Sequence, residues 1–164
     1  MGLGRSPRIV TDGLVLCLDA ANARSYPKSG TTWSDLVGGN DGAMQNMTAS
    51  NFSSDNAGIL SFDGTDEHVN CGNLETLNNI CIQMNVRVLS NPGGYRGFCG
   101  ARASGGNDHY TGFNIDMQSA STTAFTSCSF ESSIRSVPGG TNMMSSSVDF
   151  GTWCNICITT TNSD

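Results

Sequence analysis

The stretch from Ile80 to Leu89 constrains the fold most, because apolar side chains occur at every second position from Ile80 to Val88. Successive side chains of an extended chain point to opposite faces, so this spacing sorts the residues onto two faces. One face would carry Ile80, Ile82, Met84, Val86 and Val88, and the other Cys81, Gln83, Asn85 and Arg87. A period of two is typical of a strand with one buried face. We therefore predict a surface strand over 80–89, ended by a turn at 91–94.

The composition predicts the same structural class for the rest of the chain. Charged residues make up 13% of it, about half the usual share, and 20 of its 164 residues are glycine. Abundant Gly, Ser, Thr and Asn favour turns and short strands over helices. We predict a polar loop over 19–56, turns at 63–66 and 138–140, and further strands over 14–18, 59–62, 97–101, 112–117, 124–131 and 153–160. The length suits one domain, expected over 11–164 behind an N-terminal arm over 1–10.

Three motifs follow one another in the first half of the chain. They are GLVLCLDA at 13–20, GTTWSDLVGGNDG at 30–42 and FDGTDEHV at 62–69. Their order resembles the opening of LamG-like domains, the jelly-roll branch of the concanavalin A-like lectin and glucanase superfamily. Glu67 and His68 depart from the family pattern, which usually has a second Asp and an aromatic residue there. The resemblance implies an all-β, two-sheet antiparallel jelly-roll sandwich.

The last predicted strand, at 153–160, resembles the family's W-H-V-T strand. In the family, two or more strands normally follow it, and the last of them pairs beside the first. Without that pairing, the strand at 14–18 would be an exposed sheet edge. We expect the missing strands either in a longer parent protein or in another chain.

Seven cysteines raise the question of disulfides and metal binding. The only close pair is Cys154 and Cys157, which on a strand would point to opposite faces and would not share one metal ion. Cys17, Cys81 and Cys99, like Cys157, stand on predicted strands among apolar or glycine neighbours. Since free cysteine packs as a small hydrophobic residue, we predict that most are buried, reduced thiols of a protein made in a reducing cytoplasm.

The charges and the carboxylates exclude several classes of function. The net charge is −6 with Lys28 as the only lysine, so nucleic acid is not an expected partner. No apolar run approaches the roughly 20 residues of a membrane span, and no membrane partner is expected. The three glutamates, Glu67, Glu75 and Glu131, do not begin the Glu-x-Asp motif of the related glucanases. We therefore expect no enzymatic activity.

Two groups of residues are candidates for binding. A calcium ion is the first candidate ligand, because Asp63, Asp66 and Glu67 crowd one turn and many LamG-like relatives hold calcium near their loops. The alternative is that these carboxylates only shape the turn. The second candidate is a carbohydrate site, because two loops combine aromatic and polar residues. The alternative is that these loops are only solvated. Its residues would be Tyr95, Arg96, Asn107, Asp108, His109 and Tyr110.

The resemblance also implies a function. LamG-like chains of this kind are frequent among phage capsid decoration, head-fibre and tail-fibre proteins. We therefore expect a non-enzymatic structural or adhesive protein of the virion surface, made in the bacterial host cytoplasm. Its expected partners are capsid or fibre subunits, further copies of itself and a host surface glycan. By the same resemblance, Trp33 and Trp153 would be packing anchors under the sheet.

The alternative is a lectin-like carbohydrate-binding module of a larger secreted or cell-surface protein. Disulfides among Cys71, Cys81, Cys99 and Cys128 would favour that alternative, because disulfides persist in oxidising compartments.

Overall fold

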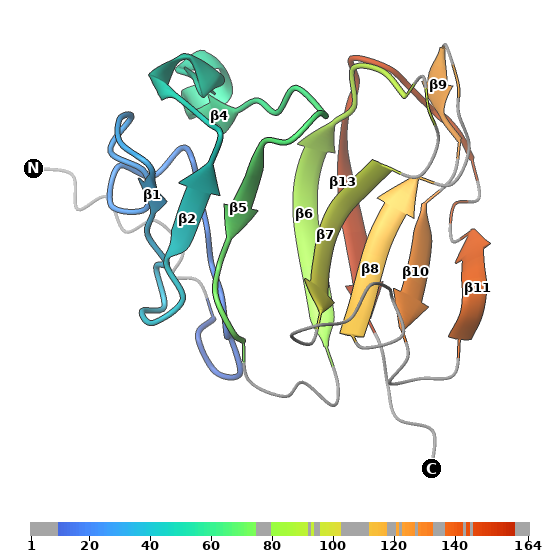
Figure 1. The fold of residues 1–164 in the computed structure, drawn as a ribbon, viewed down its shortest axis with the longest axis horizontal. Coiled ribbons are helices and arrows are strands. Elements are labelled where there is room, and N and C mark those ends of the chain that lie inside the picture. The colour runs from blue at the N-terminus through green and yellow to red at the C-terminus, as the bar shows by residue number, and fades with distance from the viewer. Residues whose placement is uncertain are drawn as a thin grey trace, which may run out of the picture. The chain divides into compact units, whose positions relative to one another are not determined.

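The computed structural model is all-β, and every strand pair in it is antiparallel (Figure 1). It describes residues 10–74, 80–91, 93, 96–102, 112–117, 121, 123–126, 128–132, 137–142, 144 and 146–159. The predicted all-β class is thus confirmed, while the jelly-roll strand order stays a prediction. Within these ranges, no helix is both long and apolar enough to span a membrane.

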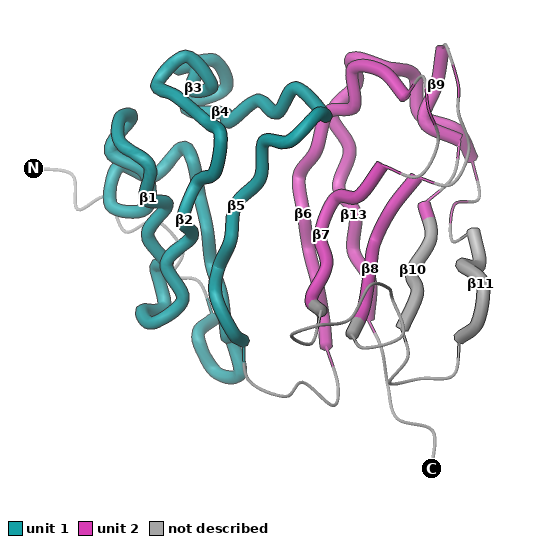
Figure 2. The backbone as a smooth tube through the Cα atoms, viewed as in Figure 1, with its two compact units in different colours: residues 1–75 teal, residues 76–164 magenta. Residues whose placement is uncertain are grey.

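The chain divides into two compact units, residues 1–75 and residues 76–164 (Figure 2). The first unit contains a three-stranded sheet in the order β1-β2-β5, with bounds Thr32–Trp33, Gly42–Gln45 and His68–Asn70. Strands β3 (Phe52–Ser53) and β4 (Ile59–Leu60) pair with each other in a separate two-stranded sheet. Along the chain, the short 3₁₀ helix Ala49–Asn51 precedes β3, and the 3₁₀ helix Asp55–Ala57 separates β3 from β4. The core of this unit consists of Tyr26, Met44 and Met47, with Trp33, Phe52, Leu60 and Val69 against them.

The predicted strand at 14–18 is wrong, because these residues belong to no strand. Their backbone groups are hydrogen-bonded to a loop instead. The amide of Leu36 donates to the carbonyl of Cys17 at 2.9 Å, and Asn40 Nδ2 donates to the carbonyl of Val15 at 3.0 Å. Strands β1 and β2 lie inside the stretch that was predicted to be a polar loop. The apolar run is therefore held by polar side chains and loop amides.

The second unit has a four-stranded sheet in the order β11-β10-β8-β7 and the two-stranded pairs β13-β6 and β12-β9. The bounds are β6 Cys81–Arg87, β7 Arg96–Arg102, β8 Gly112–Met117, β9 Ala124–Phe125, β10 Ser129–Ser132, β11 Val137–Asn142, β12 Val148–Asp149 and β13 Trp153–Thr159. Phe113, Ile115 and Met117 of β8 share one core with Ile158 of β13. Side chains of the four-stranded sheet and of the β6–β13 pair thus meet in a common interior, as in a β-sandwich.

The predictions for the second unit largely agree with the structure. β6 alternates exposed and half-buried residues along its whole length, which confirms the predicted surface strand. The strands predicted at 97–101, 112–117 and 153–160 correspond to β7, β8 and β13, whereas the one predicted at 124–131 is split into β9 and β10.

The turn predicted at 138–140 is wrong, because these residues lie within β11. Strand β11 is at the end of the strand order and its pairing with β10 shifts register between Phe130 and Ser132. A sheet edge or a bulge is where a strand tolerates proline, so Pro138 is compatible with this strand.

Candidate functional site

The outer face of the β6–β13 pair gathers an aromatic ring, a cation, amides and thiols on one exposed surface. Because β6 and β13 are antiparallel and in register, residues that alternate along each strand face partners on the other. The pairs are Trp153 with Arg87, Asn155 with Asn85, Cys157 with Gln83, and Thr159 with Cys81. All eight residues are exposed, while the residues between them are half-buried or buried. We call these eight residues the outer face.

Trp153 and Arg87 form a stacked pair at one end of the outer face. The guanidinium carbon of Arg87 lies 5.3 Å from the centroid of the Trp153 ring, within the range of a cation–π interaction. Trp153 is still 43% exposed. This corrects the expectation that Trp153 is a packing anchor under the sheet, whereas Trp33 does pack against the core of the first unit. The stack holds a flat ring and a planar cation in place at the surface.

An amide ladder continues from this pair along the outer face. Asn155 Nδ2 donates to Asn85 Oδ1 at 2.8 Å, and Gln83 Nε2 donates to Asn155 Oδ1 at 3.4 Å. These bonds fix the three amide planes. They leave the Asn85 amide nitrogen and the Gln83 carbonyl oxygen free of the ladder, as a donor and an acceptor for a ligand.

Two thiols complete the outer face. Thr159 Oγ1 donates to Cys81 Sγ at 3.6 Å. The slight desolvation of Cys157 and the neighbouring Cys81 thiol together raise the pKa of Cys157. Cys154 is half-buried and Cys157 is exposed, so the two thiols point to opposite faces as predicted.

None of the seven cysteines is in a disulfide in the structure. Their predicted burial is wrong for most of them. Cys128 alone is buried, Cys81 and Cys157 are exposed, and the other four are intermediate. The pKa of Cys128 is raised to about 11 by burial, with the nearby Asp116 and Cys154 acting in the same direction.

The three carboxylates considered for calcium are engaged in separate hydrogen bonds. Glu67 accepts from Asn51 Nδ2 at 2.8 Å and from the amide of Asp63 at 2.6 Å. Asp63 accepts from the amide of Thr65 at 2.7 Å, and Asp66 accepts from Asn46 Nδ2 at 3.0 Å. In the part of the chain that the structure describes, no three His, Cys, Asp or Glu residues are grouped to hold a metal ion. The geometry favours the role in shaping the turn, and calcium stays a prediction.

The predicted carbohydrate loops lie mostly beyond the described residues. Tyr95, Asn107, Asp108, His109 and Tyr110 all fall outside them. Arg96 is described, and it is the exposed first residue of β7.

Asp35 is a buried carboxylate that the sequence analysis did not single out. Its Oδ1 accepts from the amides of Cys17 at 2.9 Å and Val37 at 3.0 Å, and its Oδ2 accepts from the amide of Asn40 at 3.3 Å. Burial by itself would raise the pKa of Asp35, but the backbone amides around the carboxylate outweigh it and lower the pKa. Asp35 therefore stays ionised and fastens the run 14–18 to the loop at 34–41.

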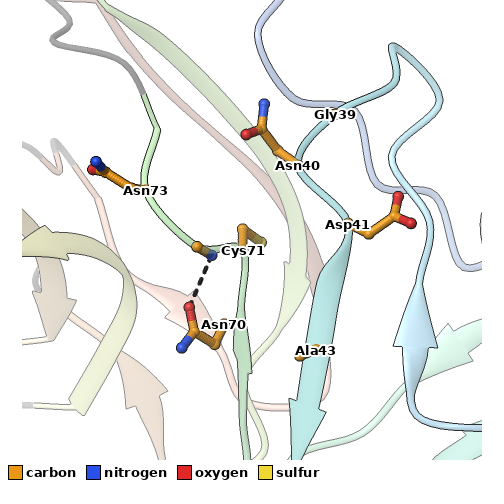
Figure 3. Close-up of a pocket in the computed structure, with 8 residues that line it drawn as sticks. Gly39, Asn40, Asp41, Ala43, Asn70, Cys71 and Asn73 are labelled. Atoms are coloured by element: carbon orange, nitrogen blue, oxygen red, sulfur yellow. Dashed lines mark hydrogen bonds between the residues drawn. The ribbon is translucent and has the colours of Figure 1, made fainter.

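A polar groove of about 480 Å³ lies beside this loop in the first unit. It is lined by Gly39, Asn40, Asp41, Ala43, Asn70, Cys71, Gly72 and Asn73. Figure 3 shows that the side chains of Asp41 and Asn73 point to opposite sides rather than toward a common centre. Asp41 Oδ1 accepts from the amide of Asp35 at 2.8 Å, and Asn70 Oδ1 accepts from the amide of Gly72 at 2.9 Å. These polar groups stabilise loops, and the outer face is the better candidate site.

Comparisons of the chain with protein-family models, with curated proteins and with solved structures found no significant match.

Proposed function

We propose that this chain is a non-enzymatic adhesive protein of a phage particle surface, and that the outer face of β6–β13 contacts the surface to which the particle adheres. The observation that carries the proposal is the exposed stack of Trp153 and Arg87 beside the amide ladder. Aromatic and arginine side chains are the groups that most often dominate the energetics of binding surfaces.

The phage setting rests on the three LamG-like motifs of the first half of the chain. The seven cysteines form no disulfide among themselves, which supports assembly in a reducing cytoplasm, where a phage particle is built. Each of β7 and β11 pairs with a single strand among those described, and such edges offer backbone groups to neighbouring subunits. This supports a homo-oligomer or a contact with capsid or fibre subunits.

Adhesion of the isolated chain tests the proposal. The full chain, labelled with a fluorophore at its amino terminus, is incubated with cells of the bacterium that the phage infects, and the bound fraction is measured after sedimentation. We expect saturable binding that weakens about tenfold or more in the double variant Trp153→Ala, Arg87→Gln. Binding that is not saturable, or that the double variant retains in full, would contradict the proposal.

A further inference from the structure

We infer that the ligand of the outer face is a carboxylate-bearing saccharide, with Trp153 against the sugar ring and Arg87 paired with its carboxylate. This inference rests on the proposed adhesive function and names the class of molecule recognised.

The charge of the outer face favours an acidic ligand. Arg87 is the only charged residue among the eight, whereas the chain as a whole has a net charge of −6. No carboxylate is paired with Arg87 in the described part of the chain. The guanidinium group presents N–H donors in a planar fork that matches a carboxylate. Because the ring of Trp153 already holds this fork, little side-chain entropy is lost when it binds.

The ring of Trp153 favours a saccharide over a small carboxylate. With 43% of its surface exposed, it retains apolar area that a partner would cover. Tryptophan combines an apolar ring with a polar edge and suits ligands that are themselves partly apolar and partly polar. The C–H groups on one side of a sugar ring present such an apolar patch, surrounded by hydroxyls.

The amide ladder extends the surface to the size of an oligosaccharide. Cross-strand pairs on one face repeat about every 7 Å along the strands. Three successive pairs, from Trp153 to Cys157 on β13, therefore span roughly 14 Å. The Asn85 amide nitrogen and the Gln83 carbonyl oxygen lie along this span and can bond sugar hydroxyls. A nucleic acid would require several clustered cations, and the outer face has one.

Tryptophan fluorescence provides a direct measurement. The chain has two tryptophans, so Trp33→Phe leaves Trp153 as the only tryptophan whose emission is followed. The buried Nε1 of Trp33 makes no hydrogen bond to any described residue, so replacing Trp33 by phenylalanine breaks no hydrogen bond with them. This background variant is titrated with oligogalacturonate, oligomannuronate and oligosialic acid, and with methyl-esterified oligogalacturonate as the neutral match. We expect saturable fluorescence changes with at least one acidic oligomer, and binding about tenfold weaker to a neutral one.

Two arginine variants locate the carboxylate contact. Arg87→Gln should abolish the preference for the acidic oligomer, whereas Arg24→Gln, the same change of charge at an exposed position of the first unit, should retain it. Calorimetry on Trp153→Tyr and Trp153→Ala, checked for folding by circular dichroism, should show binding retained by tyrosine and weakened about tenfold by alanine.

The outcomes separate this inference from the proposed function. Equal affinity for acidic and neutral oligomers, an Arg87→Gln variant that keeps the preference, or no saturable binding to any acidic oligomer overturns the inference. If cells are still bound through the outer face in that case, the adhesive function stands with a different ligand. If cell binding is absent as well, both are overturned.

Discussion

At the scale of single residues, Asp35 joins the run 14–18 of the first unit to the loop at 34–41. Its carboxylate accepts three amide hydrogen bonds, and the residue is 8% exposed. Replacement by asparagine places an NH₂ group against amide donors, so we expect Asp35→Asn to lower the free energy of unfolding by about 2 kcal/mol at pH 7. Urea denaturation measures this change.

The same residue predicts a pH dependence with a definite sign. The folded pKa of Asp35 is lowered, so its contribution to stability is present above the unfolded pKa near 3.9 and is lost as the pH falls through the folded pKa. The difference in unfolding free energy between the wild type and Asp35→Asn should therefore be largest near neutral pH and shrink below about pH 4. A difference that grows on acidification would contradict the role assigned to Asp35.

The cysteines should differ in their reactivity. At pH 8, a chromogenic disulfide reagent should modify the exposed Cys81 and Cys157 first. It should reach Cys128 only on unfolding, because this thiol is buried and its pKa of about 11 keeps it protonated. The double variant Cys81→Ser, Cys157→Ser should lose the fast phase and keep the slow one. Rapid modification of Cys128 in the native protein would contradict its burial in the core of the second unit.

At the scale of elements, Gly58 fixes the way in which the chain enters β4. Its φ is +149°, and a Cβ at this position would run into the carbonyl of Ala20. We expect Gly58→Ala to destabilise the protein by about 2–4 kcal/mol, through backbone strain and overlap together. Gly64→Ala is the matched control, because Gly64 has a φ of +73° and open space around it. This substitution should destabilise the protein by only about 1–2 kcal/mol. Thermal denaturation compares them, and equal losses would contradict the contact with Ala20.

The elements show where sequence reasoning succeeds and where it fails. Strand β6 was predictable because its alternation reflects one buried face. The apolar run at 14–18 was misread as a strand because a short run does not reveal what satisfies its backbone groups. Here those partners are Asp35, Leu36 and Asn40, about 20 residues further along. The strand β11 was missed because Pro138 is acceptable only at an edge or a bulge, which is a property of the sheet.

At the scale of the whole molecule, only the β6 half of the candidate site could be predicted from the sequence. The polar face of β6, including Arg87, follows from alternation alone. Its pairing with β13 joins residues about 70 positions apart, and the register that sets Trp153 opposite Arg87 is a tertiary property. The family resemblance predicted instead that Trp153 would be packed under the sheet. The exposed alternation of Trp153, Asn155, Cys157 and Thr159 was the signal that could have identified the site.

The proposal that this chain is an adhesive component of a virion is tested most directly by the content of purified particles. Density-gradient-purified particles of the phage proposed to encode the chain would be analysed by quantitative mass spectrometry, with and without prior surface digestion by protease. We expect peptides of this chain at a fixed copy number per particle, with the β6–β13 region removed by protease on intact particles. Particles that lack the chain, or that hold it only in a protease-resistant interior, would contradict it.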